Sequence, residues 1–172
     1  MAAAARSEKT IVIADDLRLV LLAVRRELES AGFVVCGEAT TGADALEIIR
    51  QAHPDLALLD VQMSEGGGDE IAEVLARELP DVKVVLLTAK SDEEGALSAM
   101  RSGAVGYLDK TISPSLLAHV LQDVANGEGS YPRRFIPRIA KELRAMAADD
   151  AAATAPPSRS RPHKADPSAA AH

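Results

Sequence analysis

Short apolar runs alternate along most of the chain with longer segments of helical periodicity. The apolar runs are bounded by turn residues, which is typical of buried strands, and they occupy residues 10–14, 33–36, 56–59, 82–87 and 105–108. Between them, apolar residues recur at spacings of three and four, as on one face of a helix, within residues 17–28, 45–49, 71–79, 96–100 and 116–124. The pattern therefore predicts five strands and five helices in strict alternation.

Residues typical of helix ends agree with this division. Ser91 followed by Glu94 predicts a capping box, and Ser113 followed by Pro114 predicts another helix start. Gly127 is expected to end the fifth helix. Because crossovers between parallel strands are right-handed and cover a face of the sheet, the alternation predicts an α/β fold, a doubly wound five-stranded parallel sheet with helices on both faces.

The character of the chain changes after Gly127. Basic and apolar residues interleave over residues 131–144, which predicts a short amphipathic helix at about 136–147. From residue 148 the chain is rich in Ala, Pro, Ser and Arg and has no large apolar residue, so we expect a disordered tail. The expected organisation is a disordered start at residues 1–9, one folded domain at 10–127, a linker and helix at 128–147 and a tail at 148–172.

Composition narrows the possible partners and location. The net charge is -7 and the sequence pI is near 5.1, which argues against nucleic acid as the main partner of the folded part. No stretch has the length of a membrane span or the apolar core of a signal peptide, so a cytoplasmic protein is expected. The single Cys36 cannot form an internal disulfide and is expected to be a small buried thiol.

Five polar residues follow or end the predicted strands. Asp15 and Asp16 follow the first strand, Asp60 the third, Thr88 the fourth and Lys110 the fifth. Because the carboxyl ends of parallel strands share one edge, where ligands bind, these side chains should converge. Clustered carboxylates need a cation, and oxygen ligands suit Mg²⁺. A carboxylate such as Asp60 can accept a phosphoryl group, with Thr88 as a hydrogen-bond donor and Lys110 as a balancing charge.

Four motifs in this order, IADD, LLDVQM, LLTA and GYLDK, resemble those of two-component response-regulator receiver domains over residues 10–127. The closest resemblance is to receivers that are usually joined to a helix-turn-helix output domain. It implies a flavodoxin-like sheet of order 2-1-3-4-5, and phosphorylation of Asp60 by a sensor histidine kinase or a phosphotransfer protein. It further implies that Mg²⁺ is held by Asp16, Asp60 and the backbone carbonyl of Gln62, with Asp15 acting through a water.

The resemblance also implies how such a protein signals. Thr88 would move toward the phosphoryl group and Tyr107 would turn inward behind it, which would remodel the face formed by the fourth helix, fifth strand and fifth helix. A downstream protein, or a second copy in a phosphorylation-dependent homodimer, would bind there. Gln62 and Lys90 would tune the phosphate lifetime. The only catalysis expected is on the protein itself, so it is not predicted to be an enzyme with a separate substrate.

Three positions depart from the family pattern. Ser64 stands where receivers usually carry proline, three glycines at 66–68 make the next loop permissive, and Thr111 follows Lys110 where many members have proline. None of these departures removes a catalytic residue. Altered kinetics are therefore expected rather than inactivity.

Other interpretations are open for the same residues. Asp15 and Asp16 taken alone suit a helix N-cap and first turn, and Tyr107 suits plain packing. The basic segment 133–144 could be a solvated helix face, a partner-docking helix or a linker. Two alternative functions follow: a DNA-binding regulator, or a truncated relative of one, that uses the basic segment, and a Mg²⁺-dependent phosphatase. The residues after 127 lack the apolar pattern of a helix-turn-helix unit, and no loop is long enough for a substrate cap.

Overall fold

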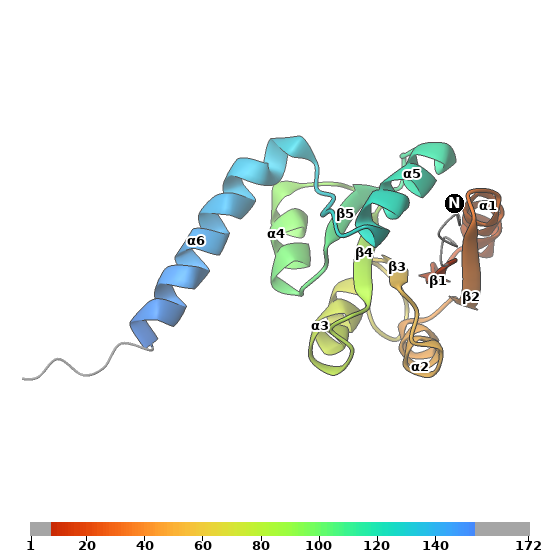
Figure 1. The fold of residues 1–172 in the computed structure, drawn as a ribbon, viewed down its shortest axis with the longest axis horizontal. Helices are drawn as coiled ribbons and strands as arrows, with labels where there is room; N and C mark the ends of the chain where they lie inside the picture. The colour runs from red at the N-terminus through yellow and green to blue at the C-terminus, as the bar shows by residue number, and fades with distance from the viewer. Residues whose placement is uncertain (1–7, 154–172) are drawn as a thin grey trace, which may run out of the picture.

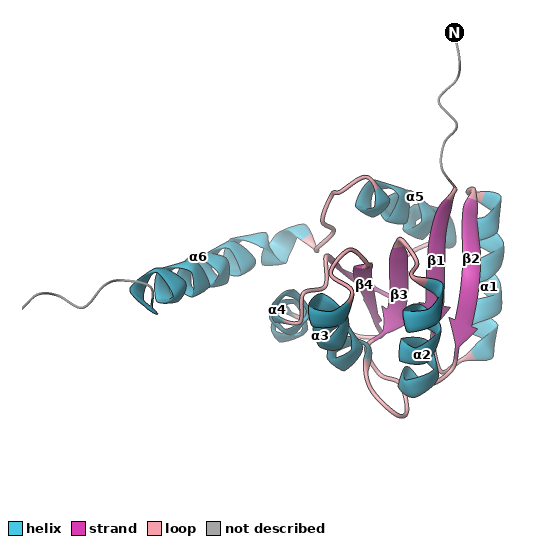
Figure 2. Ribbon diagram, turned by 60° about the horizontal axis from the view of Figure 1, so that its bottom comes forward, coloured by secondary structure: helices cyan, strands magenta, loops and turns pink. Residues whose placement is uncertain are grey.

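The sheet follows the predicted topology. The computed structural model describes residues 8–153 and contains one five-stranded parallel sheet of order β2-β1-β3-β4-β5 (Figures 1 and 2). Its strands are β1 (Lys9–Ala14), β2 (Phe33–Ala39), β3 (Leu56–Asp60), β4 (Lys83–Thr88) and β5 (Gly106–Asp109). The predicted flavodoxin-like α/β fold is confirmed. Reversal of strand order at β1 and β3 places the crevice of such folds between these two strands.

Helices cover both faces of the sheet, as predicted. α1 (Arg18–Ser30) and α5 (Pro114–Ala125) pack on one face, and α2 (Gly42–Ala52), α3 (Gly68–Glu78) and α4 (Glu93–Arg101) pack on the other. Alternation along β1 separates two aliphatic cores, since Ile11 and Ile13 join the α1–α5 side whereas Val12 and Ala14 join the other. The sheet is therefore packed on both faces, and its carboxyl edge is held between the two layers of helices.

Local signals placed most helix ends, with one error. Ser113 caps α5, accepting a hydrogen bond from Leu116 N at 3.4 Å, as predicted. The predicted capping box at Ser91 is wrong, because Asp92 is the N-cap of α4 and accepts from Gly95 N at 2.8 Å. Serine and aspartate can both cap a helix. Whether Ser91 or Asp92 caps α4 therefore depends on where the β4–α4 loop ends.

The C-terminal helix is longer than predicted. A short 3₁₀ turn, η1 (Arg133–Phe135), leads into α6 (Ile136–Ala153), so residues 148–153 are helical and the disorder predicted for them is wrong. Alanine makes up most of this stretch, and its high helix propensity extends the helix without large apolar side chains. The remainder of the predicted tail, 154–172, and residues 1–7 lie outside the described residues.

The start of this extension is joined to the sheet. Ser130 lies beside β5, where its backbone O accepts from Tyr107 N at 2.8 Å and its N donates to Val105 O at 2.9 Å. Phe135 and Ile139 are buried in the core on the α4 side. The segment thus covers the free edge of β5, and α6 then runs past α4 and away from the sheet (Figure 1).

Two further observations concern the surface. Cys36 is exposed, and its predicted burial is wrong because it lies at a register irregularity of the edge strand β2. Within residues 8–153, no helix combines the length and the apolarity that a membrane crossing would require.

Candidate active site at the carboxyl edge of the sheet

The predicted acidic and basic residues meet at the carboxyl edge. Lys110 Nζ lies 2.7 Å from Asp60 Oδ2 and 2.7 Å from Asp15 Oδ2. Asp15 directly follows β1, and Asp60 ends β3, the neighbouring strand. Lys110 is positioned by its backbone N, which donates to Thr88 O at 2.8 Å. Parallel strand ends thus bring together residues up to 95 positions apart in sequence, from Asp15 to Lys110.

Burial controls the electrostatics of this cluster. Asp15 is 2% exposed and Asp60 is 3% exposed. Burial raises the pKa of the Asp60 carboxyl, although the Lys110 hydrogen bond and the backbone N–H of Gln62 oppose this shift. For Lys110, burial lowers the pKa, but interactions with Asp15 and Asp60 outweigh it, so the pKa is raised above its usual value. The site therefore holds a charged lysine beside a carboxylate whose ionisation is disfavoured.

Three carboxylates at the site suit a metal ion. Asp15, Asp16 and Asp60 each offer one oxygen, and these oxygens all lie within 4.8 Å of one another. The buried Asp15 Oδ2 lies 2.7 Å from Lys110 Nζ in an ion pair and has no other hydrogen-bond partner among the described residues. An all-oxygen set of three carboxylates, with one lysine beside it, fits a hard divalent cation such as Mg²⁺.

The capping interpretation of the acidic pair is not supported. The N-cap of α1 is Leu17, and no side chain caps this helix. Asp15 Oδ1 accepts from Leu17 N at 2.9 Å, which shapes the turn into the helix, and Asp16 is exposed. Asp16 is therefore free of a capping role and lies open to solvent beside two buried carboxylates.

Thr88 and Tyr107 share one backbone acceptor. The Thr88 hydroxyl donates to Lys90 O at 3.0 Å and accepts from Lys90 N at 3.2 Å. The Tyr107 hydroxyl donates to the same Lys90 O at 3.4 Å. Tyr107 is 3% exposed, so its ring is already inward in this structure. Gly95 of α4 leaves room for that hydroxyl, since a Cβ there would overlap it.

Gln62 and Lys90 are exposed at the site. Gln62 N donates to Asp60 Oδ1 at 3.1 Å, while the backbone of Lys90 is held by Thr88. Within residues 8–153, neither side chain makes a hydrogen bond or an ion pair. Both side chains are thus open to solvent.

Comparison with known proteins identifies the family. The profile of the response regulator receiver domain matches residues 11–122, which include all five strands apart from the first two residues of β1. The chain belongs to this family.

Relatives of the receiver domain include whole regulators and isolated domains. It is 36% identical over 122 residues to the transcriptional regulatory protein YxjL of Bacillus subtilis, covering 70% of this chain and 56% of the relative. It is 33% identical over 134 residues to the response regulator GacA of Pseudomonas aeruginosa, covering 77% of this chain and 61% of the relative. The chain thus spans little more than half the length of these curated relatives.

Solved structures show the same architecture. The signal receiver domain of the response regulator NarL from Mycobacterium tuberculosis is 32% identical, with a TM-score of 0.68, covering 70% of this chain and 98% of that one. A LuxR-family response regulator from Aurantimonas is 25% identical, with a TM-score of 0.71 and coverage of 80% and 99%.

The loop after Asp60 tolerates serine in place of the usual proline of the receiver domain. Ser64 O accepts from Gly42 N at 2.8 Å, which ties the loop to the start of α2. Gly66 has a φ of 116°, and a Cβ at Gly68 would overlap Asp60 O. The glycines thus permit the close turn behind the site, and the loop is held without the proline.

Asp109 holds the turn next to Lys110, a role that the strand pattern did not indicate. Its Oδ1 accepts from Thr111 N at 2.8 Å and from Thr111 Oγ1 at 2.7 Å, and these hydrogen bonds lower the pKa of Asp109. The turn that follows Lys110 is therefore held by this pair where many members have proline. Aspartate two positions before threonine is a known turn signal that could have indicated this role.

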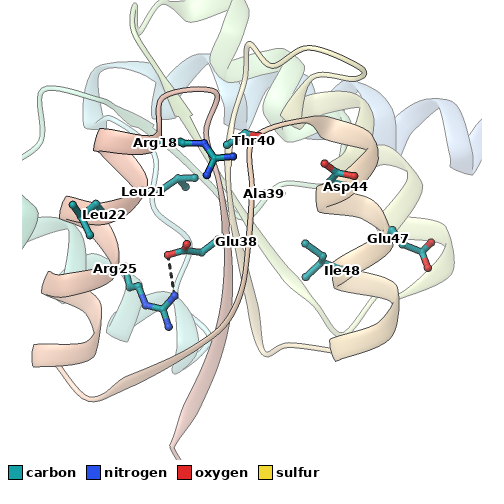
Figure 3. Close-up of a pocket in the computed structure, with 10 residues that line it drawn as sticks. All are labelled: Arg18, Leu21, Leu22, Arg25, Glu38, Ala39, Thr40, Asp44, Glu47 and Ile48. Atoms are coloured by element: carbon teal, nitrogen blue, oxygen red, sulfur yellow. Dashed lines mark ion pairs between the residues drawn. The ribbon is translucent and has the colours of Figure 1, made fainter.

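A groove elsewhere on the receiver domain is separate from the acidic site. It lies between α1 and α2 along β2, and Arg25 pairs with Glu38 in it at 3.2 Å (Figure 3). Its lining comes from α1, β2, α2 and Thr40, which follows β2. It includes neither Lys110 nor any carboxylate of the acidic cluster. The groove therefore offers no substrate pocket next to Asp60.

Proposed function

We propose that this receiver domain accepts a phosphoryl group on Asp60 in a Mg²⁺-dependent reaction and signals through a change of conformation. The observation that carries the proposal is the position of Lys110 Nζ, 2.7 Å from the oxygens of Asp15 and Asp60, beside three carboxylate oxygens within 4.8 Å of one another. One buried nucleophile, one cation and an oxygen set for a metal are the parts that phosphoryl transfer to a carboxylate needs.

In the proposed reaction, a carboxylate oxygen of Asp60 attacks the phosphorus of the donor, and the bond from phosphorus to the leaving group breaks. Lys110 and the Thr88 hydroxyl would stabilise the charge on the transferring group. Asp16, Asp60 and the backbone carbonyl of Gln62 would hold Mg²⁺, with Asp15 acting through a water, and the ion would offset the negative charge of the phosphoryl oxygens. Burial, which raises the pKa of Asp60, also makes its ionised form a stronger nucleophile.

Transmission would start at Thr88. Its hydroxyl has one proton, which it now donates to Lys90 O, so donation to a phosphoryl oxygen would break that contact. Tyr107 bonds the same oxygen and would respond with the β4–α4 loop. This links the phosphoryl group to the α4–β5–α5 face, the proposed docking face for a downstream protein or a second copy. Gln62 and Lys90 would tune the phosphate lifetime, because their exposed side chains flank the site.

The remaining parts of the proposal concern partners and place. The phosphodonor would be a sensor histidine kinase or a phosphotransfer protein, and we expect the protein to act in the cytoplasm. No turnover of a separate substrate is expected, since the product remains bound to Asp60. Measurable hydrolysis of a free phosphomonoester would favour the alternative of a phosphatase.

The test is incubation with Mg²⁺ and acetyl phosphate, followed by intact mass measurement. Wild type should gain one phosphoryl mass, and Asp60→Asn should not. Asp55→Asn, a matched change just before the other end of β3, should gain it like wild type. An adduct of equal amount in Asp60→Asn would overturn the proposal.

DNA binding is the second candidate function. The net negative charge argues against it, but the names of several relatives argue for it. One relative, 34% identical over 113 residues, is named a DNA-binding transcriptional activator, DevR/DosR of Mycobacterium tuberculosis. Two of the basic residues proposed for DNA contact are instead engaged within the chain, since Arg134 bonds Ser91 and Arg138 pairs with Glu93. A salt-sensitive gel shift that depends on phosphorylation, and is lost on deletion after Gly127, would support DNA binding.

A further inference from the structure

The C-terminal extension, residues 130–142, packs on α4 through an apolar contact. Phe135 and Ile139 are buried in the same core as Ala96 and Ala99 of α4. Both views place α6 next to α4, and its C-terminal half runs beyond the domain (Figures 1 and 2). The extension therefore already covers part of α4, which belongs to the proposed docking face, while Glu94 and Ser98 stay exposed.

Ion pairs hold the extension to both ends of α4. At the end of the helix, Arg101 pairs with Glu142 at 2.6 Å, and at its start Glu93 pairs with Arg138 at 3.4 Å. The Arg101 side chain donates through two nitrogens to one oxygen of Glu142, at 2.6 and 3.1 Å. α4 contributes an acid to one ion pair and a base to the other. A shift of α6 along α4 would bring like charges closer, so the two pairs fix the register of α6 on α4.

Arg134 reaches from the extension to the loop that carries the Thr88 contact. Its guanidinium donates to Ser91 O at 3.3 Å and to Ser91 Oγ at 3.1 Å. Ser91 directly follows Lys90, whose carbonyl accepts from both Thr88 and Tyr107. A continuous set of hydrogen bonds thus runs from the rim of the acidic site to the C-terminal extension.

We propose that the extension is an intramolecular clamp on α4 and the β4–α4 loop, which holds Lys90 and Ser91 in the position that keeps the Thr88 hydroxyl away from the phosphoryl site. The clamp rests on the proposed phosphorylation of Asp60. When Thr88 turns to a phosphoryl oxygen, the loop loses the Thr88 contact and Arg134 loses its geometry at Ser91. Because coupling between two sites is reciprocal, phosphorylation loosens the clamp and a weakened clamp favours the phosphorylated form.

This assigns the basic segment a role within the chain. Arg134 anchors the β4–α4 loop and Arg138 anchors α4, so neither belongs to a purely solvated face. Release of the clamp exposes the part of α4 that the extension covers, and it frees the apolar side chains of Phe135 in η1 and Ile139 in α6. A downstream protein that binds α4 must therefore compete with α6.

The first test compares two neighbouring arginines in the full-length chain. Arg134→Ala removes the contacts to Ser91, whereas Arg133→Ala removes an equal charge from an exposed side chain that makes no hydrogen bond or ion pair within the described residues. We expect Arg134→Ala to bind beryllofluoride, a phosphoryl mimic, with Mg²⁺ about threefold more tightly than wild type, as the loss of two exposed hydrogen bonds from one nitrogen suggests. Glu142→Gln should shift affinity in the same direction, and Arg133→Ala should match wild type. Equal affinity of Arg134→Ala and Arg133→Ala would contradict the clamp.

The second test follows α6 directly by hydrogen exchange. Amides of residues 136–147 should exchange faster in wild type after addition of beryllofluoride and Mg²⁺, and should not change in Asp60→Asn. Intact mass after acetyl phosphate treatment separates the two possible failures. If wild type gains no phosphoryl mass, the proposed function fails. If it gains the mass and α6 exchange does not change, the clamp alone fails.

Discussion

Two aspartates at opposite ends of β3 show how one strand serves two purposes. Asp55 immediately precedes the strand and accepts from Thr10 N at 2.8 Å and from Thr10 Oγ1 at 2.9 Å. The Thr10 backbone hydrogen bond is the main cause that lowers the pKa of Asp55. Asp60 ends the strand in a buried position, and burial raises its pKa. The same side chain is thus stabilised as an anion at one end of β3 and destabilised at the other.

Other contacts follow the same division. At the amino edge, Lys83 Nζ donates to Ala125 O at 2.8 Å, and Gln122 Nε2 donates to Ala31 O at 3.0 Å. These side chains satisfy backbone carbonyls at helix ends. At the carboxyl edge, three carboxylates gather around Lys110, and the buried Asp15 Oδ2 has no partner other than Lys110 among the described residues. The comparison indicates that the amino edge stabilises the fold, whereas the carboxyl edge carries charges that a metal and a phosphoryl group would satisfy.

Removal of Lys110 is expected to have the largest effect. Lys110→Met leaves two buried carboxylates without their cation and should lower the free energy of unfolding by about 2 kcal/mol, as measured by urea denaturation at pH 7. Because the pKa of Lys110 is raised, its contribution is present at neutral pH and is lost only as pH rises above its ordinary value of 10.5. Stability equal to wild type at pH 7 would contradict the pairing.

Addition of Mg²⁺ should have the next largest effect on the free energy of unfolding. At ten times its dissociation constant, Mg²⁺ should stabilise wild type by about 1.4 kcal/mol through mass action. Asp16→Asn removes one proposed ligand that has no capping role and should reduce this gain. The measurement is thermal or urea unfolding with Mg²⁺ as the only divalent cation. If Asp16→Asn gains as much stability from Mg²⁺ as wild type does, the ion binds elsewhere.

Asp60→Asn should make the protein more stable while removing its proposed phosphorylation. The folded-state pKa of Asp60 is raised, so ionisation is disfavoured on folding, and neutral Asn should gain about 1 kcal/mol at pH 7, a rise in Tm of roughly 2–4 °C. The gain should shrink as pH falls through the raised pKa toward 3.8, because Asp60 itself is then protonated. Calorimetry at pH 7 and at pH near 4 would check both signs.

Asp55→Asn is the matched substitution at the residue just before β3. It should lower stability, whereas Asp60→Asn should raise it. The pKa of Asp55 is lowered, so its contribution is present above its ordinary value of 3.8 and is lost as pH falls through the folded-state pKa. Because this side chain is exposed, the expected loss at pH 7 is only about 0.5 kcal/mol. If both variants change stability in the same direction at pH 7, the contrast between the two ends of β3 is not electrostatic.

Much of this fold could be predicted from apolar spacing. The predicted strands match the observed ones to within one residue at most ends, although β2 continues from Cys36 to Ala39. Its last residues include Gly37 and Glu38, which carry no apolar signal, and they join the sheet through pairing with β1. The meeting of Asp15, Asp60 and Lys110 was also predictable, because each of them follows or ends a strand.

Local signals were less informative for the loop before α4 and for the extension. Ser91 is a good N-cap residue, but Asp92 takes that position and Ser91 bonds Arg134, which is 43 residues away. The inward position of Tyr107 depends on space left by Gly95. Neither contact has a signature in the sequence near the residues that make it.

The sequence by itself determined the five-stranded α/β fold and the meeting of Asp15, Asp60 and Lys110, because chain direction in a parallel sheet places all strand ends of one kind at one edge. The tertiary structure alone decided that the C-terminal extension lies on α4 and that Arg134 holds the loop after Thr88. Those contacts join elements that are remote in sequence, and their partners are selected by packing and by side-chain reach rather than by periodicity.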